Sequence, residues 1–145
     1  MGDLLREEKR YVEANGWYRR AADLFPGDSR PWTRWGESAI RQQNYALATQ
    51  VLEQAAGKLP NSAAVFYTLA NAYFDAVDFA RAEAAANKAV ALAPDESAWY
   101  WIVTGRIHEK FDRSDKALAA YRRALQIDPN NLVARDGSTR LAAQP

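Results

Sequence analysis

Apolar and polar positions follow a helical period along almost the whole chain, and prolines interrupt this pattern at nearly equal intervals. No segment alternates apolar and polar residues over six or more positions, so the sequence predicts helices and no β-sheet. Four prolines end similar apolar segments, with spacings of 34, 34 and 35 residues: Pro26, Pro60, Pro94 and Pro129. An alanine stands twelve and again five residues before each of them: Ala14, Ala21, Ala48, Ala55, Ala82, Ala89, Ala117 and Ala124.

Each recurring position has a physical reason. Small residues seven apart lie on one helix face and allow a second helix to approach closely. Proline ends the second helix of each unit because it lacks an amide hydrogen. Short polar stretches predict a tight turn inside each unit: Gln43-Asn44, Val77-Asp78 and Asp112-Arg113-Ser114. Side-chain oxygens that follow the prolines predict helix caps at Asn61-Ser62, Asp95 and Asn130-Asn131.

This pattern resembles the tetratricopeptide repeat (TPR), a helix–turn–helix unit of 34 residues. The unit 29–62 matches it with Trp32, Gly36, Ala48 and Pro60, and the units 63–96 and 98–131 match it in the same register. Residues 1–28 fit the latter part of a unit, with Gly2, Leu5, Tyr11, Tyr18 and Pro26. The resemblance implies a single all-α domain over residues 1–145, a right-handed α-solenoid of antiparallel helix pairs with about 3.5 repeats.

The two ends of the chain depart from the repeated unit. Met1 would occupy the seventh place of a unit, so we expect an N-terminally incomplete first repeat, either excised from a longer protein or naturally short. Residues 132–143 are expected to form a C-terminal capping helix. Gly137 and Ser138 have low helix propensity, so this helix is expected to fray. One extra residue between Pro94 and Trp101 leaves the register of the last unit's first turn open.

Composition and charge restrict the chemistry. Lysine and arginine number 19 against 18 aspartate and glutamate, so bulk charge does not favour nucleic acid. Without cysteine, and with His108 as the one histidine, we expect no enzyme activity, no metal and no cofactor. No apolar run is long enough to span a membrane and no signal-peptide pattern is present. We therefore expect a soluble protein, in the cytoplasm rather than the periplasm.

By the resemblance, the first helix of each pair lines a concave groove, and the positions that face it recur with helical spacing. We therefore predict that a peptide or helix of a partner protein binds there. An amide and aromatic side chains offer backbone hydrogen bonds and contact area, and arginines can pair with carboxylates. The candidate groove residues are Arg30, Thr33, Glu37, Ile40, Arg41, Tyr67, Asn71, Phe74, Asp75, Trp99, Ile102, Arg106 and Lys110.

One family subclass binds chaperone tails through lysine, asparagine and arginine on successive first helices. The corresponding places here hold Thr33 and Glu37, then Thr68, then Trp99 and Val103. A register one unit earlier does not supply the set either. The sequence therefore argues against binding of an acidic chaperone tail in that mode.

Two other functions stay open at this point. The incomplete first unit leaves apolar faces around Leu4, Leu5, Tyr11 and Trp17 uncovered, which favours self-association into a homo-oligomer. Alternatively, the chain is an accessory interaction segment of a larger multidomain protein. The fold alone does not choose the partner.

Overall fold

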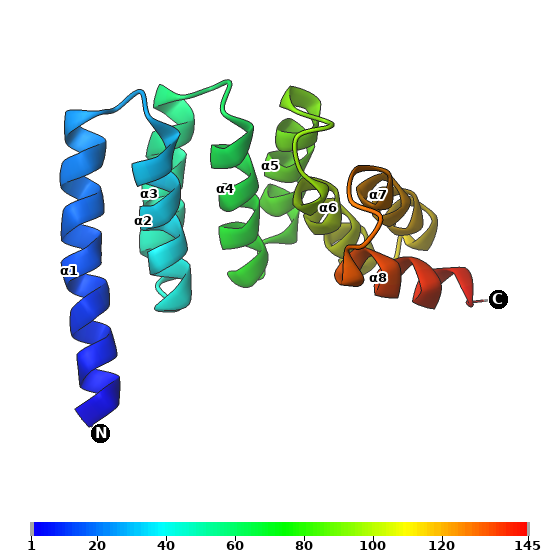
Figure 1. The fold of residues 1–145 in the computed structure, drawn as a ribbon, viewed down its shortest axis with the longest axis horizontal. Coiled ribbons are helices and arrows are strands. Elements are labelled where there is room, and N and C mark those ends of the chain that lie inside the picture. Colours follow the sequence, from blue (N-terminus) through cyan, green and yellow to red (C-terminus); the bar gives the residue numbers. More distant parts are fainter. Residues whose placement is uncertain (1, 145) are drawn as a thin grey trace.

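The computed structural model describes the backbone of residues 2–144 and the side chains of residues 7–144. Within this part the chain forms eight α-helices and no strands, which confirms the predicted all-α solenoid (Figure 1). The helices are α1 (Gly2–Leu24), α2 (Ser29–Arg41), α3 (Tyr45–Lys58), α4 (Ala63–Asp75), α5 (Phe79–Leu92), α6 (Ala98–Lys110), α7 (Ser114–Ile127) and α8 (Leu132–Ala142).

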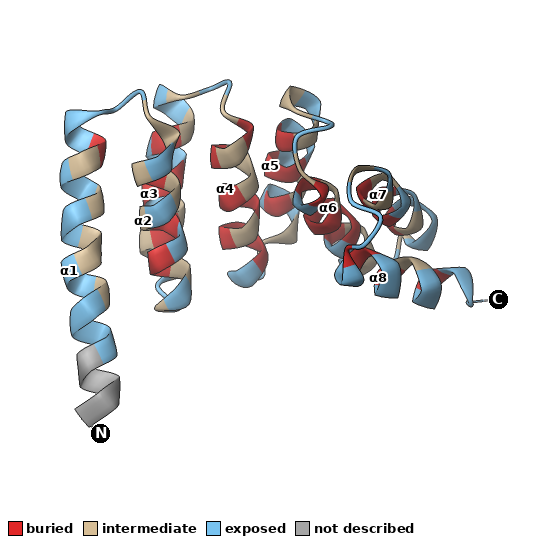
Figure 2. Cartoon of the chain, in the orientation of Figure 1, coloured by how far each residue is buried: buried red, intermediate tan, exposed pale blue. Residues whose placement is uncertain are grey.

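The helices stack as antiparallel pairs, α2 with α3, α4 with α5 and α6 with α7. Each first helix also packs against the second helix of the preceding pair. The first helices contact one another as well, α2 with α4 and α4 with α6, whereas no comparable contact joins α3 to α5 or α5 to α7. The first helices therefore form the more closely spaced, inner side of the stack. Figure 2 shows the buried residues on the facing sides of the paired helices.

The turn inside each complete pair uses one residue in the left-handed backbone region. These residues are Gln43, Val77 and Asp112, with φ angles of 57°, 63° and 55°. The amide of the next residue then reaches back to a carbonyl near the end of the first helix, as Asn44 does to Ala39 (2.9 Å). The three complete pairs therefore share one turn geometry.

Side-chain caps start most of the helices, as the polar residues predict. The side chains of Asp28, Asn44, Ser62, Asp78 and Asn131 each accept a hydrogen bond from a first-turn amide. The prediction for Asp95 is wrong. The extra residue after Pro94 moves the start of α6, so that Ser97 is its cap and Asp95 instead forms an ion pair with Arg123.

Close approach between helices depends on small residues that face large ones. A Cβ atom added to Gly36 would lie 2.6 Å from the Leu52 side chain. The ring of Tyr121 is held between α6 and α8, where a Cβ at Gly105 or Gly137 would lie 2.8 or 2.7 Å from it. Gly137, which the sequence suggests would weaken α8, is therefore the residue that lets α8 dock on Tyr121.

The first helix differs from the expectation for an incomplete unit. The positions one repeat before the turn residues Gln43 and Asn44 are Lys9 and Arg10, but α1 continues through them as one helix of 23 residues. Glu8, Lys9 and Arg10 are good helix formers, which favours the continuous helix. Its N-terminal part extends beyond α2 and α3 (Figure 1).

We expect Gly105→Ala to lower the free energy of unfolding by about 1–3 kcal/mol, because the added methyl group collides with the Tyr121 ring. The matched control is Gly57→Ala in α3, where nothing lies within 4 Å of an added Cβ. This change should raise stability by about 0.4–1 kcal/mol. Urea unfolding followed by circular dichroism compares the two, and equal effects would contradict the packing account.

We expect Val77→Asn to stabilise the chain by about 0.5–1 kcal/mol. A β-branched residue is strained at positive φ, whereas asparagine tolerates this region. Val77 is exposed, so the change removes little buried surface. The thermal midpoint should rise, and an unchanged or lower midpoint would show that the turn stores no strain.

Candidate functional site

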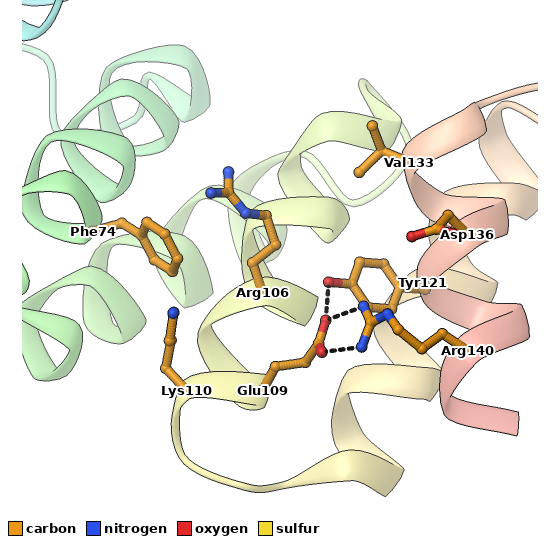
Figure 3. Close-up of a pocket in the computed structure, with 8 residues that line it drawn as sticks. All are labelled: Phe74, Arg106, Glu109, Lys110, Tyr121, Val133, Asp136 and Arg140. Carbon is orange, nitrogen blue, oxygen red and sulfur yellow. Dashed lines mark hydrogen bonds and ion pairs between the residues drawn. The ribbon is translucent and has the colours of Figure 1, made fainter. Parts of the chain in front are cut away.

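The inner side of the stack carries an open pocket of about 450 Å³ toward its C-terminal end (Figure 3). The pocket is bounded by α4, α6, α7 and α8. Its lining combines an aromatic ring, an aliphatic side chain and several charged groups: Phe74, Arg106, Glu109, Lys110, Tyr121, Val133, Asp136 and Arg140.

Two cations of α6 stand over the ring of Phe74. The guanidinium carbon of Arg106 lies 4.5 Å from the ring centroid, and Nζ of Lys110 lies 5.9 Å from it. The two residues are one helical turn apart, so they share a face of α6. Both are exposed, and neither forms an ion pair within residues 7–144. The pocket therefore offers positive charge beside an aromatic surface.

Glu109 has a different role, because its carboxylate is fully engaged inside the protein. Arg140 donates to both oxygens, at 2.6 and 3.0 Å, and the hydroxyl of Tyr121 donates to Oε1 at 2.6 Å (Figure 3). The hydrogen bonds from Arg140 and, more weakly, from Tyr121 lower the pKa of Glu109. Burial and this carboxylate raise the pKa of Tyr121. The network fixes α8 to α6 and α7 and neutralises Arg140.

Several predicted groove residues lie close to this pocket. Phe74, Arg106 and Lys110 line it. Burial raises the pKa of the neighbouring Asp75, and the charge of Arg106 offsets part of this rise. Tyr67 and Asn71 lie half-buried on the same helix as Phe74. The ring of Tyr67 is 5.0 Å from that of Tyr100, so it also packs α4 against α6.

Other predicted groove residues lie apart from the pocket. Ile102 is only 2% exposed and belongs to the apolar cluster that joins α6, α7 and α8, so its predicted place on the groove surface is wrong. Trp99 is 47% exposed at the start of α6. The predicted residues on α2 do not reach the pocket. Arg30 pairs with Asp28, and the Thr33 hydroxyl donates to the Arg30 carbonyl. Glu37 is exposed, Ile40 packs on the core and Arg41 faces α1.

The predicted groove set omitted the α8 side of the pocket. Val133, Asp136 and Arg140 hold the second, fifth and ninth places counted from Leu132, which are the same places that mark groove positions in the complete units. Continuing the register into the capping helix would have found them. The contact of the Tyr121 hydroxyl with Glu109 has no sequence signal.

His108 lies outside the pocket, half-buried on α6. Burial lowers its pKa, and the charges that act on it come from Glu83, Arg113 and Lys116. Within the described residues no group of three or more histidine, aspartate or glutamate side chains is placed to hold a metal ion. None of the described helices combines the length and apolar character that a membrane crossing needs.

Comparison with known proteins identifies the repeated unit. A family model described as tetratricopeptide repeat matches residues 33–97 and again residues 67–131. Anaphase-promoting complex subunit 6 of Arabidopsis thaliana is 27% identical over 140 residues. These residues are 94% of this chain and 26% of that protein, so the chain spans about a quarter of this relative's length.

Solved structures of TPR proteins share the fold. MamA superposes with a TM-score of 0.79 at 21% identity, over 97% of this chain and 82% of that one. The Arabidopsis OM64 TPR domain gives 0.75 at 22% identity, over 81% and 96%. The first TPR of Spaghetti (RPAP3), bound to the HSP90 peptide SRMEEVD, gives 0.74 at 24% identity, over 79% and 93%.

The Glu109 network generates a pH prediction. A carboxylate whose pKa is lowered on folding stabilises the protein fully above its unfolded pKa, about 4.3, and this contribution is lost as the pH falls through the folded value. We expect Glu109→Gln to cost about 1–2 kcal/mol at pH 7, and the difference from wild type to shrink below about pH 4. The urea midpoints of wild type and variant, measured from pH 7 to pH 3, give this difference in stability. Glu37→Gln, an exposed control on α2, should leave the midpoints unchanged.

Proposed function

The chain belongs to the tetratricopeptide repeat family, whose repeats generally mediate protein–protein interaction, and from this we propose that it binds a short segment of a partner protein in the pocket between α4, α6 and α8. One observation carries the proposal. Arg106 and Lys110 stand over Phe74 in an open pocket and have no ion-pair partner within residues 7–144. The proposed role is recognition, without a chemical step.

The pocket chemistry selects the kind of segment. A carboxylate of the partner would meet two cations whose charge is not neutralised internally, and an apolar group beside it would contact Val133, which is 44% exposed in the pocket lining. Glu109 does not oppose this, because Arg140 and Tyr121 already hold its carboxylate. The proposed ligand is therefore a segment with an acidic residue next to an apolar one.

The rest of the groove would hold the segment's backbone. Asn71 is half-buried on α4, and its amide can both donate to and accept from a peptide unit. Tyr67 and the exposed Trp99 offer aromatic surface. We propose that the segment runs from the pocket across these three residues. The candidates on α2 would be reached only by a longer ligand: Arg30, Thr33, Glu37, Ile40 and Arg41.

The fold is compatible with this role. The RPAP3 domain of similar fold holds the peptide SRMEEVD in its solved structure. The places where the chaperone-binding subclass has its lysines and asparagines hold Thr33, Glu37, Thr68, Trp99 and Val103 here. We therefore expect the preferred motif of this chain to differ from that peptide.

A peptide-display selection tests the proposal. The baits are the wild-type chain and the double variant Arg106→Ala/Lys110→Ala, both checked by circular dichroism. We expect the wild type to enrich an acidic–apolar motif, and the double variant to bind the selected peptide at least about tenfold more weakly because both charge-assisted contacts are lost.

The matched control is Lys88→Ala. Lys88 also stands over an aromatic ring, 5.9 Å from the centroid of Phe66, but in a different pocket, between α4 and α5. It should bind the selected peptide as the wild type does. Equal enrichment by the double variant would place the binding site elsewhere. No enrichment by any bait would count against recognition of short segments.

A further inference from the structure

Helix α1 carries an apolar face that nothing in the described chain covers. In Figure 2 it is exposed along most of its described length, and Ala22 is its one buried residue within 7–24. Trp17 and Leu24 are among the most exposed large apolar side chains. The side chains of Leu4 and Leu5, which the sequence assigns to the same uncovered region, lie outside the described residues.

The equivalent face is buried in the other second helices, α3, α5 and α7. Trp17 stands nine residues before its closing proline, in the place held by Val51, Ala85 and Ala120. Those three are 2, 6 and 4% exposed, whereas Trp17 is 69% exposed. The positions that hold buried alanines in α3, α5 and α7 are also only half-buried in α1, at Ala14 and Ala21. In the complete pairs, an antiparallel first helix covers this face.

We propose that a second copy of the chain covers this face, so that two α1 helices pack antiparallel in a closed dimer. An antiparallel α1 would have the direction that first helices have against second helices in α2–α3, α4–α5 and α6–α7. Ala14 and Ala21 lie seven residues apart on the uncovered face and allow two helices to approach closely. Trp17 lies between them, at the centre of the contact.

The charge pattern of α1 favours a second α1 helix as the partner that covers this face. Glu13 lies four residues before Trp17, and Arg20 lies three residues after it, on the same flank of the helix. Antiparallel pairing around a two-fold axis near Trp17 sets Glu13 of each copy opposite Arg20 of the other, so the contact contains two equivalent ion pairs. Both residues are exposed, and neither forms an ion pair within residues 7–144.

The opposite end of the molecule exposes Leu132 and Val133 at the start of α8, but the α8 face that corresponds to the packing face of α2 is polar. On α2, the residues Trp32, Trp35 and Gly36 pack on α3. The equivalent positions of α8 hold Arg135, Ser138 and Thr139. These polar residues cannot cover the Trp17 face as an apolar first helix would. A head-to-tail contact of α1 with α8 is therefore disfavoured, and the assembly closes at two copies.

Sedimentation velocity over about 1–200 µM protein tests the dimer, since a self-associating chain changes mass with concentration. We expect a monomer–dimer equilibrium in the wild type. Trp17→Ala should weaken it at least about thirtyfold, because the central aromatic is lost from both copies. Trp17 is exposed in the single chain, so circular dichroism should show an unchanged fold.

A charge swap separates the proposed pairing from a general effect of substitution. Glu13→Arg or Arg20→Glu alone puts like charges opposite each other and should weaken association about fivefold or more, whereas the double swap should restore it. Arg122→Glu, an exposed control on α7, should associate as the wild type does. The Arg106→Ala/Lys110→Ala variant should also dimerise normally, which keeps this test independent of the peptide site.

Four results would overturn the proposal. The first is a monomer mass at every concentration. The second is a dimer that survives Trp17→Ala. The third is a pair of single charge reversals that the double swap does not rescue. The fourth is a mass that keeps rising beyond two copies, because open-ended growth requires a head-to-tail contact.

Discussion

Close approach of helices at small residues is the constraint on which this array depends. Gly36 faces Leu52 across the first complete pair, and Gly105 faces Tyr121 across the third, with no room for a methyl group at either glycine. Buried alanines on α3, α5 and α7 allow the same approach in every pair. Since the paired helices are close, the first helices also meet one another and form a continuous inner side. The pocket lies on this side, bounded by α4, α6, α7 and α8.

Tyr121 connects the packing of the core to the chemistry of the pocket. Its ring is enclosed by α6 and α8, and its hydroxyl donates to Glu109, which also accepts from Arg140. This arrangement satisfies the one carboxylate of α6 that faces the pocket. Arg106 and Lys110, on the same helix, are left with their charge available over Phe74. The ion pair of Glu109 with Arg140 thus leaves Arg106, Lys110 and Asp136 as the charged groups of the lining that form no ion pair within residues 7–144.

The two ends of the array have opposite character. At the C-terminal end, α8 turns Ala134, Gly137 and Leu141 inward, and its exposed residues are mostly polar apart from Leu132 and Val133 at its start. At the N-terminal end, α1 exposes Trp17 and Leu24 on a face that is covered in the complete pairs. The proposed peptide pocket and the proposed dimer contact lie near opposite ends. Binding of a peptide and pairing of two copies therefore do not compete for one surface.

The sequence by itself determined the fold class, the helix pairs, their turns and most caps, because these follow from local signals repeated in register. The family resemblance, which assigns first helices to the concave side, and the helical spacing together predicted Phe74, Arg106 and Lys110 as groove residues. Only the tertiary structure buried Ile102 and joined Glu109 to Arg140 from 31 residues away. Burial and ion pairing depend on which helices meet, and periodicity within one helix carries no information on the neighbour that covers it.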